Sequence, residues 1–332
     1  MYVNEMPRYE ILSDEAMDVL DRGWRRIVSE LGVEFMLPEA VEYFRAAGQK
    51  VEENKVFLDP EFVLEQVAKA PREFDLQARN PEKSLHIGGD HMSFSGVYGP
   101  PFVREGATRR DAKMADFENF VRLAQAFDEL DSAGGTIVEP EDRPLDSRHL
   151  DMVYALQTLS DKPYMGSVIS AENARDTVAM GEILFGGELP ASPVSISLIN
   201  CNSPLRWDDR MLSAMLEYNR TNQAVITTPF LLMGAMSPVS IPATLVQQMA
   251  EALSGIALCQ LVQPGCPVVF GSFLSNTDMK TGSPSFGTPE SAIGLLCTGQ
   301  IARRFGLPWR SGGGLNASTV VDAQAAYESL MT

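Results

Sequence analysis

The sequence predicts an α/β protein built as a TIM (β/α)8 barrel. From about residue 132 onward, short apolar runs alternate with polar or glycine-rich loops and longer amphipathic stretches. Strand–loop–helix units in series are typical of a parallel sheet. Several of these runs are continuously apolar, as expected for strands buried on both faces. The predicted strands cover residues 135–138, 164–169, 194–199, 224–228, 267–271 and, more weakly, 307–310.

The number of units is the third observation. About six strand–helix units fit into this part of the chain, whereas a closed barrel of this class has eight strands. The helix predicted over residues 322–331 runs to the last residue, Thr332, without a stop signal. We therefore expect a barrel that is C-terminally truncated after about six units.

The first 90 residues predict a small N-terminal α+β layer. A helix over residues 13–31 begins with Ser13 as its N-cap and Asp14 in its first turn, and Gly32 ends it. Two more helices each carry an early proline, which suits the first helical turn. These helices cover residues 38–47 and 60–69, and short strands are expected at residues 56–58, 74–78 and 84–87.

The predicted domain organisation follows from these patterns. Residues 1–90 form a helical and α+β region that serves as a cap or a dimerisation layer, which predicts a homo-oligomer. Residues 91–131 combine a loop-rich segment with a helix at 116–127 that leads into the first strand. Residues 132–332 form the incomplete barrel.

Composition excludes several classes of function. The net charge of −17 argues against nucleic acid, which selects basic surfaces. We expect no membrane span, because an apolar run of ~18 residues is missing. The N-terminus lacks a secretory signal, so we expect a cytoplasmic protein with reduced cysteines. Four cysteines and three histidines in this arrangement do not match a metal site.

In barrels of this kind the active site lies at the C-terminal ends of the strands. The residues at the predicted strand ends are mostly amides, hydroxyls and aromatics, and titratable groups are scarce. Acid–base and metal chemistry need such groups near the reacting atom. The composition therefore indicates a site that orients a substrate whose leaving group needs no proton. The candidate residues are Glu139, Asn200, Asn202, Phe230, Phe273, Asn276, Trp309, Arg310, Leu315 and Asn316.

The aromatic candidates suit a quaternary ammonium ion, which binds to the faces of aromatic rings. Ordinary core packing is the alternative for each ring, and Trp309, beside Arg310, is the best functional candidate. Asn200 and Asn202 are either ligand-binding amides or turn formers before Pro204, since an unpaired buried amide costs about 1–3 kcal/mol. Glycines 312–314 form a tight loop that allows close approach of a ligand.

Glu139 has two interpretations of equal weight. It either balances the charge of a cationic ligand or caps a helix.

The motifs SPLRWDDRML, PFLLMGAMSP and DAQAAYE resemble the trimethylamine methyltransferase family, including its pyrrolysine-free relatives that act on glycine betaine and similar compounds. The similarity extends from about residue 10 to the end of the chain. It implies a TIM barrel that moves a methyl group from an amine to a Co(I) corrinoid (cobalamin) carried by a partner protein. No tightly bound cofactor is implied. The family's chains continue beyond the equivalent of Thr332.

Alignment on Asp322, Gln324 and Glu328 places Leu315 where the methylamine enzymes carry pyrrolysine, and adds Gln324 to the substrate-binding candidates. The resemblance therefore implies a quaternary amine such as glycine betaine as the methyl donor. Three alternatives remain. They are a trimethylamine-type methyltransferase, a non-catalytic betaine-binding barrel module and, more weakly, a barrel lyase or aldolase, which would need a Schiff-base lysine or a metal site.

Overall fold

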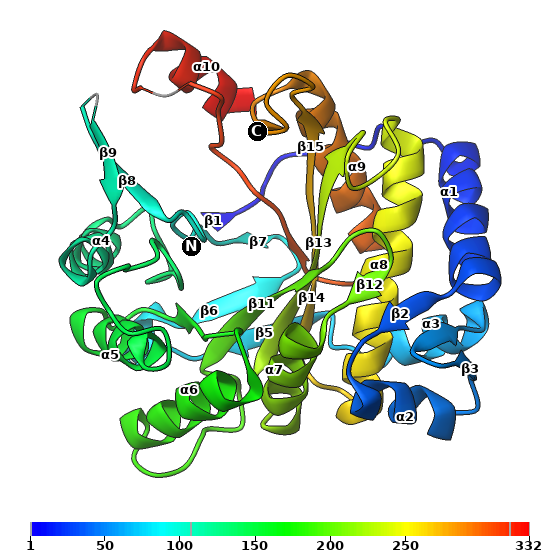
Figure 1. The fold of residues 1–332 in the computed structure, drawn as a ribbon, viewed down its shortest axis with the longest axis horizontal. Helices are drawn as coiled ribbons and strands as arrows, with labels where there is room; N and C mark the ends of the chain where they lie inside the picture. The colour runs from blue at the N-terminus through cyan, green and yellow to red at the C-terminus, as the bar shows by residue number, and fades with distance from the viewer. Residues whose placement is uncertain (1, 107, 319, 332) are drawn as a thin grey trace. The chain divides into compact units, whose positions relative to one another are not determined.

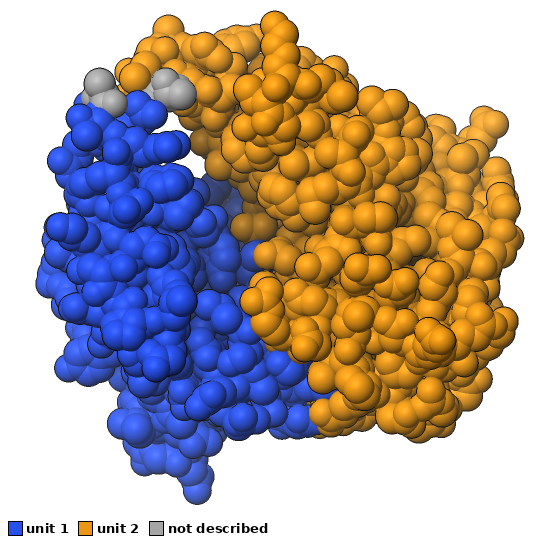
Figure 2. Space-filling model, in the orientation of Figure 1, with its two compact units in different colours: residues 1–5, 72–198, 213–225 blue, residues 6–71, 199–212, 226–332 orange. Residues whose placement is uncertain are grey.

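The computed structural model describes residues 2–106, 108–318 and 320–331. The chain forms two compact units, coloured separately in Figure 2. Unit 1 comprises residues 1–5, 72–198 and 213–225, and unit 2 comprises residues 6–71, 199–212 and 226–332. The domain boundaries expected from the sequence, at residues 90 and 131, stay a prediction.

The N-terminal part of unit 2 combines three helices with a small sheet. Helix α1 (Asp14–Arg26) begins at Ser13, whose hydroxyl accepts a hydrogen bond from the backbone N–H of Ala16, and continues as a π-helical turn (Ile27–Leu31) up to Gly32. Helices α2 (Pro38–Ala46) and α3 (Pro60–Val67) also lie where expected. The sheet has the order β12-β2-β4-β3, formed by Arg206–Trp207, Val33–Phe35, Lys55–Phe57 and Lys50–Glu52.

Unit 1 contains three short antiparallel pairs. They are β1 (Tyr2–Val3) with β7 (His91–Met92), β5 (Glu73–Leu76) with β6 (Leu85–Gly88), and β8 (Phe102–Glu105) with β9 (Thr108–Asp111). The last hairpin corrects the loop expected around residues 90–113. Its strands carry Arg and Glu side chains on mostly exposed surfaces, so they lack the apolar alternation that reveals a strand.

The predicted parallel sheet is present, which confirms the α/β class. Its strands follow the order β10-β11-β13-β14-β17, of which β11, β13 and β14 are labelled in Figure 1. The pairs β10–β11, β13–β15 and β14–β17 are parallel. Strands β11 and β13 each begin in unit 1 and end in unit 2. A complete barrel and its truncation stay predictions. The bounds are β10 (Tyr164–Met165), β11 (Ser195–Cys201), β13 (Ala224–Met233), β14 (Val268–Gly271), β15 (Phe273–Thr277), β16 (Pro284–Ser285) and β17 (Trp309–Arg310).

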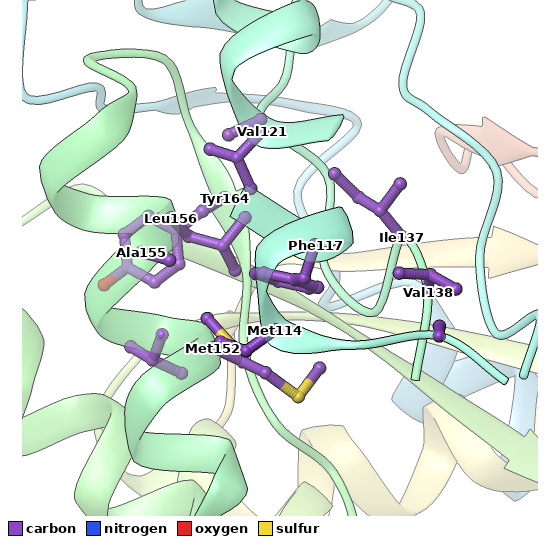
Figure 3. Packing of buried hydrophobic residues seen from close by; sticks show 12 residues of the cluster. Met114, Phe117, Val121, Ile137, Val138, Met152, Ala155, Leu156 and Tyr164 are labelled. Carbon is purple, nitrogen blue, oxygen red and sulfur yellow. The ribbon is translucent and has the colours of Figure 1, made fainter. Parts of the chain in front are cut away.

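The first predicted strand, residues 135–138, is wrong. The segment forms one isolated bridge, from Gly134 to Tyr164, and then turns, with the Ile137 N–H donating to the carbonyl of Gly135 at 2.9 Å. Gly134 has a φ of 83°, which interrupts extended backbone. The side chains of Ile137 and Val138 instead enter the core cluster of unit 1, which they share with Phe117 of the preceding helix α4 (Met114–Ala126) (Figure 3).

Two further corrections concern the strands of unit 2. The strand predicted over residues 224–228 is longer than expected, because β13 continues through Pro229 to Met233. Beyond the proline its neighbour is β15, an unpredicted strand whose Phe273 lies opposite Phe230. Phe230 therefore lies within a strand rather than in a loop after it.

The helices of the sheet region are mostly amphipathic, except α8 (Ile241–Val262), which is buried almost throughout. Its length and apolarity would allow it to cross a membrane, but 83% of its most apolar window is buried in the structure. It packs against α1, α3 and α9 and is the core helix of unit 2. The others are α4 (Met114–Ala126), α5 (Arg148–Leu159), α6 (Ala171–Leu184), α7 (Asp209–Arg220), α9 (Pro289–Arg304) and α10 (Ala323–Met331).

Candidate active site at the strand ends

A stack of aromatic rings lies in unit 2, where β15 begins to pair with β13. Phe230 and Phe273 face each other in the β13–β15 register, with ring centroids 4.5 Å apart and an interplanar angle of 8°. Phe286 contacts Phe273 edge-on at 5.6 Å. Phe230 and Phe273 are half-buried. The two phenylalanines proposed separately from the sequence therefore form one surface, and Phe286, in the loop after β16, is an addition that no periodicity could reveal.

Leu315 joins this cluster. It lines a small cavity with Phe273, Phe286 and Gly312. The cavity measures about 10 Å³, roughly the room that one water molecule needs, so it does not itself hold an amine. The surface available to a ligand is the part of the aromatic rings that stays exposed.

Trp309 and Arg310 form β17 and lie opposite Phe270 and Gly271 of β14. The indole Nε1 of Trp309 donates to the hydroxyl of Ser272 at 3.3 Å, and a Cβ added at Gly299 of α9 would lie 3.3 Å from its ring. The side chain is still 41% exposed. Packing against α9 therefore accounts for much of its position.

The two asparagines after the third predicted strand differ. Asn202 is a turn former: its N–H donates to the Arg206 carbonyl at 2.7 Å, and its Oδ1 accepts from the Asp208 N–H at 3.3 Å. Asn200 is half-buried near the end of β11. None of the described residues forms a hydrogen bond with its side-chain amide. Of the two, Asn200 is the amide that can bind a ligand.

Three other predicted amides are held by the protein itself. Asn276 donates to Glu290 at 3.0 Å, Asn316 to Ser329 at 3.2 Å and Gln324 to Glu328 at 2.8 Å. Glu328 also accepts from the N–H of Ala317 at 2.7 Å. The contacts of Asn316 and Ala317 with Ser329 and Glu328 fasten α10 to the loop that carries Leu315. Their role in substrate binding stays a prediction.

Glu139 lies in unit 1 and forms an ion pair with Arg148, whose Nη1 is 3.1 Å from its Oε1. Arg148 is buried and also donates to the Pro140 carbonyl at 3.1 Å. The charge of Glu139 is therefore balanced by a neighbouring side chain, an arrangement that neither of the two sequence interpretations included.

The residue that the sequence reasoning missed is Glu251 in the middle of α8. It is fully buried and accepts hydrogen bonds from the Ser203 hydroxyl at 2.7 Å, the Leu205 N–H at 2.8 Å and the Gln247 amide at 2.8 Å. Burial raises the pKa of its carboxyl above the usual 4.5. A lone carboxylate in an otherwise uncharged helix of 22 residues was the available signal.

Metal binding has no support in the described part of the chain. No group of three or more His, Cys, Asp or Glu side chains among these residues is arranged to hold a metal ion. All four cysteines are buried and none of them forms a disulfide, and burial raises the pKa of the Cys297 thiol to about 11 and that of Cys266 to about 12.

Comparison with known proteins gives a consistent result. The family described as trimethylamine methyltransferase (MTTB) matches residues 1–332. A glycine betaine methyltransferase of Desulfitobacterium hafniense (strain Y51) is 45% identical over 98% of this chain and 69% of its own length. A proline betaine:corrinoid methyltransferase of Eubacterium limosum is 28% identical, covering all of this chain and 70% of its own.

A solved structure gives the same fold. The monomethylamine methyltransferase MtmB of Methanosarcina barkeri matches with a TM-score of 0.54 and 11% sequence identity, over 90% of this chain and 66% of that protein. At this identity the match bears on the fold alone, and it agrees with an α/β barrel-like architecture.

Proposed function

Because the chain belongs to the trimethylamine methyltransferase family, we propose that it transfers a methyl group from a quaternary amine of the glycine betaine type to a corrinoid carried by a partner protein. We place this reaction in the cytoplasm. The observation that carries the choice of donor is the stacked pair Phe230–Phe273, an uncharged aromatic surface where β15 begins to pair with β13. The relatives named for betaines support the same choice.

The chemistry of a quaternary amine fits such a surface. The carbon–nitrogen bond breaks with its electron pair on nitrogen, so the tertiary amine leaves without a proton. The corrinoid supplies Co(I), whose two electrons form the new bond to the methyl carbon. The protein therefore has to bind, orient and desolvate the donor rather than act as a general acid. The neutral residues around Phe273 suffice for this task.

Each residue of the site has a role in this proposal. The exposed parts of the Phe230 and Phe273 rings contact the trimethylammonium group, an interaction of about 0.5–2 kcal/mol per good contact. Phe286 holds the Phe273 ring by its edge. The amide of Asn200 donates to the carboxylate of the betaine.

Leu315 bears on the choice between two donors. The resemblance places it where methylamine enzymes carry pyrrolysine, and in the structure its side chain lines the cavity beside Phe273 and Phe286. An aliphatic group there supplies no group that reacts with an amine. This observation favours a quaternary donor over trimethylamine.

Calorimetry tests the proposal on the intact protein. Glycine betaine should bind, and dimethylglycine, which has lost one methyl group, should bind roughly tenfold more weakly, because the lost methyl group contacts the rings and a protonated tertiary amine stays better hydrated. Equal binding of the two compounds, or preferential binding of trimethylamine, would contradict the proposed donor. Binding of glycine betaine without methyl transfer would favour the non-catalytic binding module instead.

A further inference from the structure

Glu251 holds the chain segment that follows Asn200. Its carboxylate accepts from the hydroxyl of Ser203 and from the backbone N–H of Leu205. The thiol of Cys201 donates to the Arg206 carbonyl at 3.0 Å, and burial together with the nearby Glu251 carboxylate raises its pKa well above the usual value. Ser203 and Leu205 are therefore both attached to one point on α8.

The geometry of β11 determines on which face Asn200 lies. Successive side chains of a strand point to opposite faces. Cys201 is buried on the face of β11 that meets Glu251, whereas Asn200 belongs to the opposite face and is only half-buried. Holding Ser203 and Leu205 against α8, just beyond the end of β11, therefore restrains the direction of the Asn200 amide.

The arrangement is energetically expensive for a purely structural contact. Burying a carboxylate costs several kcal/mol, which its hydrogen bonds repay only in part. No ion pair to Glu251 is present among the described residues, so no cation offsets this cost. A neutral side chain would hold a loop at lower cost. The carboxylate has a particular advantage, because its two oxygens accept from Ser203 and Leu205 at the same time.

The other end of the segment is anchored independently. Arg206 and Trp207 form β12, which pairs with Glu34 and Phe35 of β2, and the guanidinium of Arg206 contacts the Glu34 carboxylate at 2.7 Å. Loss of the Glu251 contacts would thus loosen residues 201–205 locally without detaching β12. A substitution of Glu251 can therefore test its effect on residues 201–205 without disrupting β12.

We propose that Glu251 is a positioning residue for the methyl transfer: it holds residues 201–205 so that the amide of Asn200 meets the carboxylate of the donor. This inference rests on the function proposed above. It also makes a prediction that loss of stability alone does not make. Ligands that carry a carboxylate depend on Glu251, and ligands that have only the ammonium group do not.

The test compares glycine betaine with tetramethylammonium, which has the same cationic group and no carboxylate. Glu251→Gln keeps the size of the side chain but has one acceptor oxygen where the carboxylate has two. We expect the KM for glycine betaine and its dissociation constant to rise roughly tenfold, with kcat within about twofold and tetramethylammonium binding unchanged. Ser203→Ala, which removes one donor, should act in the same direction with a smaller effect.

Gln260→Met is the matched control. Gln260 is buried on the same helix and holds another turn, by accepting from the Gly265 N–H at 2.8 Å and donating to the Cys266 carbonyl at 3.0 Å. This variant should lower the melting temperature and leave the ratio of the two dissociation constants unchanged.

The results separate the two proposals. If the wild-type protein binds glycine betaine but Glu251→Gln binds it equally well, or loses both ligands to the same extent, the positioning role is wrong and the proposed function stands. If the wild-type protein binds neither ligand, the proposed function fails, and the positioning role fails with it. Asn200→Ala should abolish the difference between wild type and Glu251→Gln, because the two residues act as a unit.

Discussion

Unit 1 and unit 2 use polar residues in opposite ways. In unit 1 the charged groups are paired: Glu139 with Arg148, and Lys162 with three backbone carbonyls at 2.6–2.8 Å. In unit 2 the candidate residues Phe230, Phe273 and Asn200 are half-buried and uncharged, and the carboxylate of Glu251 is buried. The difference teaches that charge in unit 1 maintains the fold, whereas in the proposed function the neutral residues of unit 2 bind the cationic group of the donor.

The largest effect is expected from removing a structural charge in unit 1. Lys162→Met leaves the carbonyls of Ala124, Phe127 and Leu130 without their donor and should lower the free energy of unfolding by about 3 kcal/mol. Urea denaturation measures this loss. The KM for glycine betaine should stay within about twofold of wild type. A raised KM with unchanged stability would mean that Lys162 contributes to donor binding, and it would contradict the view that the charged residues of unit 1 only stabilise the fold.

A smaller effect is expected on the aromatic surface of unit 2. Phe273→Leu removes the ring face and should weaken glycine betaine binding by about 1–2 kcal/mol, roughly 5- to 30-fold. Calorimetry measures it. Phe57→Leu is the matched control, because Phe57 is an equally half-buried phenylalanine on β4 in the N-terminal sheet of unit 2. If both variants bind as wild type does, the stacked rings are ordinary core packing.

The smallest effect concerns acid stability. Lys83 and the amides of Gln125 and Asn80 lower the pKa of Asp161 in unit 1 to about 2 from its ordinary value of 3.8. A lowered folded-state pKa stabilises the fold above the unfolded value and loses that contribution as the pH falls from about 4 to about 2. Thermal unfolding of Asp161→Asn should therefore show a weaker pH dependence in this range than wild type.

The carboxyl of Glu251 in unit 2 should change the stability with pH in the opposite direction to that of Asp161. Its folded-state pKa is raised, so protonation as the pH falls adds stability rather than removing it. Glu251→Gln should not reduce the acid sensitivity between pH 4 and 2 in the way that Asp161→Asn does. If both variants flatten the pH profile equally, the distinction between the two units does not hold for these carboxyls.

The sequence predicted the parallel sheet and its helices because the spacing of apolar residues and the continuous apolar runs indicate directly which residues are buried. The sequence-based prediction failed where residues are buried without forming a strand, and where a strand continues beyond its apolar run. Ile137 and Val138 are buried in a turn, and β13 continues through Pro229 by taking β15 as its neighbour. The stacking of Phe230 on Phe273 depends on that register, which no local pattern specifies. Asn202 and Asn276 are held by contacts within the protein, and sequence alone does not reveal such partners.

The central claim is methyl transfer from a quaternary amine. The most direct test mixes the intact protein with glycine betaine and free cob(I)alamin, a surrogate for the corrinoid protein, and follows the Co(I) absorbance together with the amine product. We expect methylcobalamin and dimethylglycine to form in equal amounts, and trimethylamine to give neither methylcobalamin nor dimethylamine. Turnover of trimethylamine with no reaction of glycine betaine, carnitine or proline betaine would contradict the account.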